Sequence, residues 1–384
     1  MRIGLITTLN SNIGDDFIRE GICLVLREVF QGQELEFVPV NKHRPMTVYP
    51  QWHPCHWAEW LPRGKRYAYP FLGKLFHRAG HSRFDDCQLI VQCGAPVIWP
   101  GCHGCEWAGP LWHQVVGRLF SRVPVLNLAA GSCYAWENQP ISITDPEDAK
   151  YLKAILGYCR LTTVRDTLAQ RLCASLGAQV PHIRCSALLA AKDFQAGDTE
   201  DGPILINYME GGGHFGWDQN IDTGVWQHTV KTLIGRLQKR HRLAFICHNQ
   251  KEYDLAGEMD VSLPRLWPKN PAAYFSQVAA AKVALCNRMH AAVGLAGLGI
   301  PSVAVGADTR LLMVAALGLP HYYVKDSTAD QLEEDLENLL AFRHQERERL
   351  LSLQSETFDT YERAVSEALA GLLLPQTQPA DIHL

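Results

Sequence analysis

The sequence has no large excess of charge of either sign and no uninterrupted apolar run long enough to span a membrane. Its 384 residues include 36 Lys and Arg against 40 Asp and Glu, a formal net charge of −4. This slightly acidic balance argues against a general nucleic-acid binder, which needs a basic face for phosphates. The longest apolar stretch, residues 291–307, is cut by Pro301. It therefore predicts a helix followed by a buried strand instead of a membrane span.

A secretory leader is not recognisable, because the apolar run at residues 3–6 is too short and no small-residue cleavage site follows it. The twelve cysteines are spread thinly over the chain, so we expect reduced thiols in a cytoplasmic protein. Cys102 and Cys105 form one Cys-x-x-Cys pair around His103, but a second pair with suitable spacing is missing. A structural zinc site is therefore disfavoured, and we expect no bound metal.

Short apolar runs alternate with longer segments of helical period, and hydrophobic residues make up 47% of the chain. This composition excludes a disordered chain. The alternation, interrupted by a polar segment at residues 193–202, predicts an α/β protein with two Rossmann-like, doubly wound domains facing a cleft. We expect an N-terminal domain at residues 1–195 on the acceptor side and a C-terminal domain at residues 203–328 on the donor, anion-binding side. Residues 329–384 predict a helical segment that packs back across both domains and ends in a frayed tail.

Loops that follow strands are the first place to look for a site, because ligands of such sheets bind outside the carboxyl ends of the strands. Asn12, Gly14 and Asp15 lie between the first predicted strand, residues 3–8, and the helix predicted at residues 15–30. Gly14 permits a tight turn, and the helix N-terminus offers free amide groups to an anion. An ordinary capped turn explains the same residues equally well.

Charged side chains follow several later strands. Arg165 and Asp166 directly follow one of them. An aspartate at such a place is most often a helix cap, whereas the planar fork of an arginine suits a carboxylate or phosphate. His248 and Arg310 follow two strands of the second half, and Glu252 lies just downstream of His248. All three lie on the predicted cleft side, where each either binds substrate or remains solvated.

The strongest constellation is Arg288 and His290, which follow the strand predicted at residues 283–286 and begin a helix lined with Ala and Gly. The helix dipole already favours an anion at this end, and two positive side chains would add to it. The same dipole lowers the proton affinity of a histidine, so a purely structural histidine is poorly placed here. Spacing alone leaves the structural and the catalytic role open.

At four stretches the sequence resembles the polysaccharide pyruvyl transferase family: residues 12–16 (Asn-Ile-Gly-Asp-Asp), 164–166 (Val-Arg-Asp), 288–291 (Arg-Met-His-Ala) and 298–301 (Leu-Gly-Ile-Pro). The resemblance extends over residues 1–325. It implies a two-domain architecture like that of GT-B glycosyltransferases and a bacterial enzyme of polysaccharide biosynthesis. It also implies phosphoenolpyruvate as co-substrate, without a cofactor, and a sugar or glycan precursor that receives the pyruvyl group as a ketal.

The family places donor-binding positive residues at its Arg-x-His motif, which here is Arg288 and His290. Phosphoenolpyruvate carries a phosphate and a carboxylate, and the cations they need would come from four side chains: Arg165, Arg288, His290 and Arg310. His290 then acts as the general acid or as a phosphate partner, and Arg288 holds charge that develops on the phosphate. Asp15 or Asp166 accepts the proton of the attacking hydroxyl.

The sequence departs from the family at three places. Family members often have a Gly-rich strand end where this chain has residues 93–96 (Cys-Gly-Ala-Pro). Many have an Asp-Pro where this chain has Cys185-Ser186, and many have a Lys near the position of Arg310. These differences affect the expected acceptor more than the expected fold.

Two other functions use the same architecture or the same fold. A nucleotide-sugar glycosyltransferase or epimerase often holds a ribose or donor sugar with a carboxylate of the second domain, but the sequence has no acidic residue between Asp260 and Asp308. A non-catalytic binding protein would tolerate the changes near Cys93 and Cys185. The expected partners are a small-molecule donor and a sugar acceptor, without nucleic acid. A lipid-linked acceptor would add a peripheral contact with a membrane.

Overall fold

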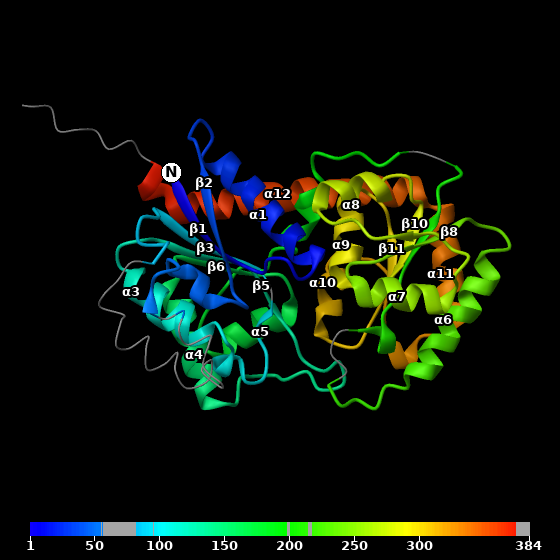
Figure 1. The fold of residues 1–384 in the computed structure, drawn as a ribbon, viewed down its shortest axis with the longest axis horizontal. Helices are drawn as coiled ribbons and strands as arrows, with labels where there is room; N and C mark the ends of the chain where they lie inside the picture. Colours follow the sequence, from blue (N-terminus) through cyan, green and yellow to red (C-terminus); the bar gives the residue numbers. More distant parts are fainter. Residues whose placement is uncertain (55, 57–81, 95, 198–199, 214–216, 374–384) are drawn as a thin grey trace, which may run out of the picture.

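The computed structural model describes the chain except for residues 55, 57–81, 95, 198–199, 214–216 and 374–384, so the predicted frayed tail lies outside the described residues. Two sheets lie side by side (Figure 1). In the first, the strand order is β2-β1-β3-β5-β4, with β6 also paired to β5. Its strands, joined by parallel pairings, are β1 (Arg2–Thr7), β2 (Glu36–Asn41), β3 (Leu89–Cys93), β4 (Pro96–Ile98), β5 (Val125–Ser132) and β6 (Leu161–Val164).

The second sheet has the strand order β12-β11-β10-β7-β8-β9, again through parallel pairings. Its strands are β7 (Ile204–Asn207), β8 (Leu243–Ile246), β9 (Arg265–Leu266), β10 (Val283–Cys286), β11 (Ser302–Gly306) and β12 (His321–Tyr323). Successive residues of β10 face two different apolar cores, with Val283 in one and Ala284 in the other. The central strands are therefore apolar throughout, as the sequence pattern predicted for parallel sheets with helices on both faces.

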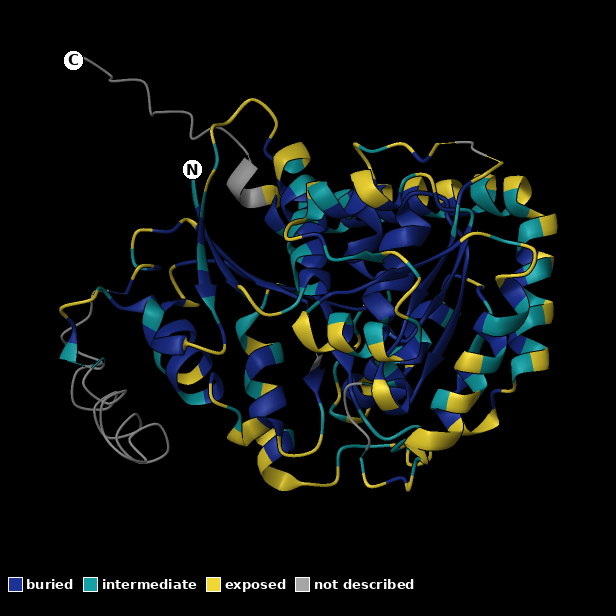
Figure 2. Cartoon of the chain, turned by 45° about the vertical axis from the view of Figure 1, so that its right-hand side comes forward, coloured by how far each residue is buried: buried dark blue, intermediate teal, exposed yellow. Residues whose placement is uncertain are grey.

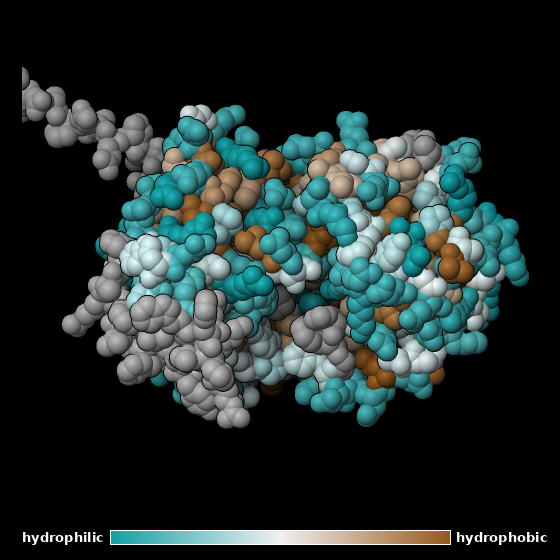
Figure 3. Space-filling view, viewed as in Figure 1, coloured by the Kyte–Doolittle hydropathy of each residue, from teal (hydrophilic) through white to brown (hydrophobic). Residues whose placement is uncertain are grey.

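The α-helices are α1 (Ile13–Val29), α3 (Gly117–Leu119), α4 (Pro146–Tyr158), α5 (Thr167–Ser175), α6 (Thr223–Leu237), α7 (Gln250–Met259), α8 (Pro271–Val278), α9 (Met289–Gly297), α10 (Leu312–Ala315), α11 (Ala329–Ala341) and α12 (Arg343–Leu373). Short 3₁₀ segments are η1 (Pro45–Val48), η3 (Cys102–Gly104), η5 (Ser186–Ala191), η6 (Glu210–Gly212), η7 (Thr309–Leu311) and η8 (Val324–Asp326), and η4 (Ala108–Val116) is π-helical. The strands are buried and the outer helix faces are exposed (Figure 2). Hydrophilic side chains dominate the face shown in Figure 3.

The two sheets share a continuous apolar core that contains residues of both. Segment η5 packs between α1 and α9, and two glycines permit this close approach. A Cβ on Gly21 would lie 1.9 Å from the Ser186 carbonyl oxygen, and one on Gly297 would lie 2.4 Å from that of Leu188. Helix α12 contacts both α1 and α9 and runs along both halves (Figure 1). The N-termini of α1 and α9 are thereby held close together.

Hydrogen bonds connect the end of β5 and the residues after it with the segment that follows β11. The Thr309 hydroxyl accepts a hydrogen bond from the Tyr134 N–H at 3.0 Å and pairs with the Ser132 hydroxyl at 3.0 Å. Ala135 and Asp308 form an isolated antiparallel bridge beside it. In the described part of the chain, no helix is long and apolar enough to cross a membrane.

Some elements differ from the sequence-based expectation. Helix α7 was not expected, although Asn249 caps it by accepting from the Glu252 N–H at 2.9 Å. The long helix expected after residue 329 is divided at Phe342 into α11 and α12. These differences arise where a local cap or break outweighs the apolar period.

Candidate active site

A cavity of about 330 Å³ lies between the two sheets. It is lined from the first half by Thr8, Ser11, Asn12, Asp15, Lys42, His43, Trp99, Trp107 and Cys133, and from the second by Trp217, Asn249, Arg288, His290 and Arg310. Many of these residues directly follow strands, so the carboxyl ends of the strands meet at this cavity as expected. A narrow recess of about 20 Å³ shares Asn12, Arg288, His290 and Arg310 with it.

The start of α1 contacts the second half through Asn12 and Gly14. The Asn12 side-chain oxygen caps α1 by accepting from the Gly14 N–H at 3.1 Å, and it lies 3.3 Å from His248 Nδ1. A Cβ on Gly14 would lie 2.6 Å from that of His290. The loop is therefore a capped turn that also forms one wall of the cavity. Asp15, the next residue, lines the cavity, and no described residue pairs with its carboxylate.

His290 is largely buried in the cavity wall and contacts Arg165. Arg165 Nη1 lies 3.0 Å from His290 Nε2. Because a guanidinium only donates, Nε2 accepts this hydrogen bond, and the proton of the neutral ring lies on Nδ1. Burial lowers the pKa of His290 well below its ordinary value, and the charges of Arg165 and Arg310 lower it further. His290 is therefore neutral at pH 7 while the cavity holds no anion.

Arg165 is fully buried, and no described carboxylate forms an ion pair with it. Its Nη2 has no hydrogen-bond partner among the described residues. The side chain lies against Gly131, where a Cβ would approach Nε to 2.4 Å. An uncompensated buried charge is costly unless an anion compensates it at some stage. Arg165 does not itself line the cavity and reaches it through His290.

Asp166 is not placed to act as the proton acceptor. One carboxylate oxygen caps α5 by accepting from the Ala169 N–H at 2.7 Å and also accepts from the Ser132 hydroxyl at 2.8 Å. The other accepts from the Ser132 N–H at 2.8 Å, and Asp166 does not line the cavity. Of the two carboxylates proposed from the sequence, Asp15 therefore remains the candidate base.

The two arginines of the second half that line the cavity, Arg288 and Arg310, are each paired with a carboxylate. Arg288 Nε and Nη2 both lie 2.6 Å from one oxygen of Glu252, and Arg310 binds Asp308 through Nε at 2.8 Å and Nη2 at 2.5 Å. Burial opposes the charge of Arg310, but the Asp308 carboxylate raises its pKa above the usual range. These ion pairs hold both guanidinium groups in place and leave little net charge on this wall.

Glu252 is not solvated, which corrects one of the two roles expected for it from the sequence. It is 3% exposed, and four donors surround its carboxylate: Asn207 Nδ2, the His248 N–H, Asn249 Nδ2 and Arg288. His248 is likewise buried and does not line the cavity. Burial lowers the pKa of His248 to about 4, so the ring is neutral, and it positions Asn12.

Lys42 is a cavity residue that the sequence analysis missed. It directly follows β2, is 4% exposed, and its ammonium lies 4.6 Å above the Trp107 ring. Burial lowers the pKa of Lys42 to about 8. The available signal was its place after a strand, which is the place of the other site residues. Trp99, Trp107 and Trp217 add three indole rings to the same cavity.

Helix α9 begins without the side-chain cap that other helices have. Helices α1, α4, α5, α6, α7, α8 and α11 each start at a residue whose side chain accepts from a first-turn N–H. At the corresponding place α9 has Arg288, which forms no such bond. Met289 and His290 instead line the narrow recess, together with Gly212 and Gly213. Uncapped amides beside arginine favour an anion.

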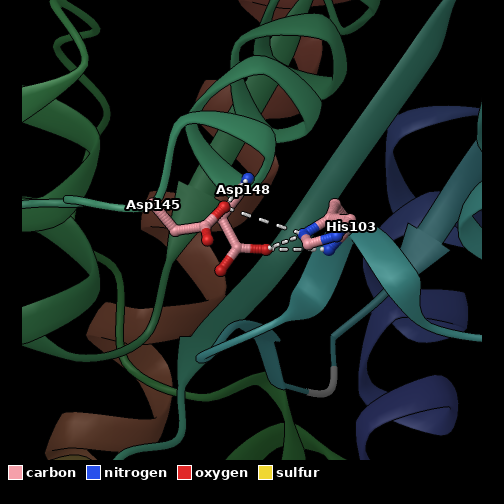
Figure 4. A group of neighbouring side chains, drawn as sticks. All are labelled: His103, Asp145 and Asp148. Carbon is pink, nitrogen blue, oxygen red and sulfur yellow. Dashed lines mark hydrogen bonds and ion pairs between the residues drawn. The ribbon is translucent and has the colours of Figure 1, made fainter.

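The Cys102–Cys105 segment lies outside this cavity and binds its own carboxylate. His103 Nδ1 lies 2.7 Å from Asp148, with Asp145 at 3.9 Å (Figure 4). Asp148 also accepts from the Gly101 and His103 N–H groups and from the Cys102 thiol. Burial raises the pKa values of Cys102 and Cys105, the latter to about 11. Both cysteines are therefore thiols, and the three-residue group of Figure 4 anchors a loop.

Comparisons with solved structures show the fold of the chain, and a family model shows its family. The chain is similar to the UDP co-structure of MnaA from S. aureus, with 13% identity, full coverage of both chains and a TM-score of 0.54. It is also similar to a UDP-GlcNAc 2-epimerase from Neisseria meningitidis, at 10% identity and a TM-score of 0.55, with 97% of this chain and 100% of that chain covered. The enzyme of the same name from Methanocaldococcus jannaschii has 11% identity and a TM-score of 0.51, with 88% and 93% covered.

These similarities show a GT-B-like fold and, at such low identity, only the fold. No curated protein matches the chain. The model of one protein family, described as polysaccharide pyruvyl transferase, matches residues 12–309. That range includes every strand of the two sheets except β1 and β12, and it contains the lining residues from Asn12 to His290. The chain belongs to the polysaccharide pyruvyl transferase family.

Proposed function

We propose that the protein transfers the pyruvyl group of phosphoenolpyruvate to two hydroxyls of a sugar or glycan precursor, forming a ketal and releasing phosphate. Membership of the family supports a transferase. The observation that carries the choice of donor is His290, a neutral histidine at the uncapped start of α9. It lies among Arg165, Arg288 and Arg310, and it lines both the cavity and the recess. A small dianionic or trianionic donor suits this surrounding.

Binding of the donor would allow His290 to take up from solvent the proton that the reaction requires. The same cations that lower the pKa of His290 in the empty site would be neutralised by a bound phosphate and carboxylate. A negative charge close to a histidine raises its pKa, so donor binding would be accompanied by proton uptake at His290. Because the proton enters at Nε2, the hydrogen bond from Arg165 breaks, and this guanidinium becomes available to the donor.

The chemical steps then balance without a cofactor. His290 gives a proton to the methylene carbon of the donor, and the first sugar hydroxyl attacks the neighbouring carbon while Asp15 takes its proton. The carbon–phosphate oxygen bond then breaks, and Arg288 and Arg310 hold the charge of the departing phosphate. The second hydroxyl attacks the same carbon, and the phosphate takes its proton. The methylene has become the methyl group of the ketal.

The walls of the cavity support a sugar as the acceptor. Trp99 and Trp107 line it from the N-terminal half, as Asp15 does. Indole faces bury the apolar face of a pyranose ring while the hydroxyls remain free to react. The described cysteines are unpaired thiols, which supports a reaction in the reducing cytoplasm.

Calorimetric titration with phosphoenolpyruvate tests this function. The titration is run at pH 7 in two buffers with different ionisation enthalpies, so that proton uptake is measured together with affinity. We expect saturable binding with uptake of up to one proton in the wild type, and binding without uptake in His290→Gln. Arg288→Lys should weaken binding, because one ammonium cannot replace the guanidinium fork. Arg122→Lys, at an exposed position, is the matched control.

Two results would contradict the proposal. Absence of phosphoenolpyruvate binding together with tight binding of UDP or UDP-GlcNAc would favour a nucleotide-sugar enzyme like the similar structures. Phosphoenolpyruvate binding without phosphate release, tested with a panel of p-nitrophenyl hexopyranosides, would favour the non-catalytic binding protein if no member of the panel is modified.

A further inference from the structure

The cations around the cavity differ in whether a carboxylate already neutralises them. Arg288 is paired with Glu252, Arg310 with Asp308, and His43 lies 2.5 Å from Glu106. Lys42 also lines the cavity, but among the described residues no hydrogen-bond acceptor or carboxylate contacts its ammonium. It is therefore the cavity cation for which a ligand anion would provide the largest gain.

Lys42 is held in this position by the fold. Its backbone N–H donates to the Thr7 carbonyl at 2.8 Å, which extends the pairing of β2 with β1 by one residue. Lys42 is buried, and the Trp107 ring covers its side chain. A buried ammonium without a counterion destabilises the folded protein. Such a group is retained where a ligand supplies the missing charge.

The electrostatic surroundings of Lys42 indicate which end of the substrate pair it faces. The groups that act on its charge are the carboxylates of Asp15 and Glu106, the Cys105 thiol and the guanidinium of Arg165. Arg165 repels Lys42 and also contacts His290, the residue at the start of α9. An anion that contacts His290 and reaches Lys42 would relieve the repulsion between these two unneutralised cations. This is the place of the donor in the proposed reaction.

We propose that Lys42 is a donor ligand from the N-terminal half, which binds a phosphate or carboxylate oxygen of phosphoenolpyruvate. The inference rests on the proposed function and extends it: the donor site is composed of both halves, and the donor bridges them. Its two anionic groups are then shared between the α9 end and the Lys42 end of the cavity. The acceptor sugar packs against the tryptophan rings beside the donor and needs no charge of its own.

Calorimetry with phosphoenolpyruvate on three variants of the full chain tests this inference. Lys42→Met should weaken phosphoenolpyruvate binding by about 10- to 100-fold, since a charge-assisted hydrogen bond contributes about 1.5–3 kcal/mol. Lys42→Arg keeps a cation and should stay within several-fold of the wild type. Lys153→Met, at an exposed position of α4, is the matched control and should bind like the wild type.

Two further measurements separate a lost ligand from a damaged fold. Without donor, Lys42→Met should unfold at a temperature equal to or above that of the wild type, because an uncompensated buried charge has been removed. The wild-type affinity for phosphoenolpyruvate should decline above pH 8 as Lys42 loses its proton, whereas Lys42→Arg should not show this decline.

The outcomes are distinct from those of the proposed function. Absence of phosphoenolpyruvate binding to the wild type overturns the function itself. Wild-type binding that Lys42→Met matches at every pH overturns the role of Lys42 and leaves the function standing. Unchanged donor binding with lost transfer in Lys42→Met would assign Lys42 to the acceptor, and this also overturns the inference. Inorganic phosphate and pyruvate as separate probes then identify which anionic group of the donor Lys42 contacts.

Discussion

The two walls of the cavity differ in how their charges are satisfied. On the C-terminal wall, Arg288 and Arg310 are each bound to a buried carboxylate of the same half. On the N-terminal wall, Asp15 and Lys42 face the cavity, and no described residue pairs with either. The first arrangement fixes geometry at little net charge, and the second leaves charge for a substrate.

This difference separates structural from functional charge within one site. A carboxylate whose two oxygens both accept hydrogen bonds, such as that of Glu252 or Asp166, stabilises the folded protein. A carboxylate such as Asp15, which lines the cavity without a partner, contributes little to folding and remains available for proton transfer. The contrast therefore predicts that rate and stability will respond to different substitutions.

The largest expected effect is that of Asp15→Asn on the rate. The loss of a general base should lower phosphate release from phosphoenolpyruvate, with the best acceptor of a hexopyranoside panel, by roughly 10²- to 10⁴-fold. The free energy of unfolding should fall by less than about 1 kcal/mol, because the carboxylate has no hydrogen-bond partner to lose and acts only on the start of α1 and on Lys42. Asp16→Asn is the neighbouring control, since Asp16 forms a helix ion pair with Arg19 at 2.7 Å. Equal rates in the two variants would remove Asp15 from the mechanism.

The second effect is a loss of stability, and it is expected on the opposite wall of the cavity. Glu252→Gln removes a negative charge from four donors and leaves Arg288 buried without its counterion. Breaking such a buried pair costs about 3–5 kcal/mol, measured as the free energy of unfolding in urea. Glu258→Gln, exposed on the same helix, should change this free energy by less than about 0.5 kcal/mol. A stable Glu252→Gln variant would show that the C-terminal wall is not fixed by its ion pairs.

Much of the architecture and part of the site follow from local sequence pattern. The alternation of apolar runs with helical segments predicted the two parallel-sheet halves, because each strand is buried on both faces. Asn12, Arg288 and His290 were found because they follow strands, and the carboxyl ends of parallel strands meet at one edge. Spacing within a few residues is sufficient for this kind of inference.

What the sequence could not predict are the partners of these residues. Arg165 and His290 are 125 positions apart, and Arg288 and Glu252 are 36 apart. Whether a charge is paired depends on distances that only the folded chain defines, so Asp166 was proposed as a base although its oxygens are occupied. Lys42 was missed for the same reason, because its burial depends on Trp107 from a distant segment.

The third effect is a loss of stability in acid, carried by His248. Its pKa is lowered to about 4, so the unfolded chain takes up a proton at a higher pH than the folded protein. The stability is complete above the ordinary histidine pKa of about 6.5 and falls as the pH decreases, by roughly 2 kcal/mol at pH 5. His248→Asn keeps an N–H for Asn12 and should remove this part of the dependence, while the part that comes from His290, whose pKa burial also lowers, remains. Exposed His228→Asn should leave it unchanged.

The smallest expected effect concerns the group outside the cavity in Figure 4, where charges are paired as on the C-terminal wall. Burial alone would raise the pKa of Asp148, but the hydrogen bonds of His103 lower it, and two backbone N–H groups also bind this carboxylate. His103→Ala should therefore cost only about 1 kcal/mol of unfolding free energy, since its side chain is 40% exposed. Phosphate release should be unchanged in this variant and in wild type treated with EDTA. A rate lost to EDTA and restored by zinc would instead make these paired residues a metal centre, and pairing would no longer distinguish structural from functional charge.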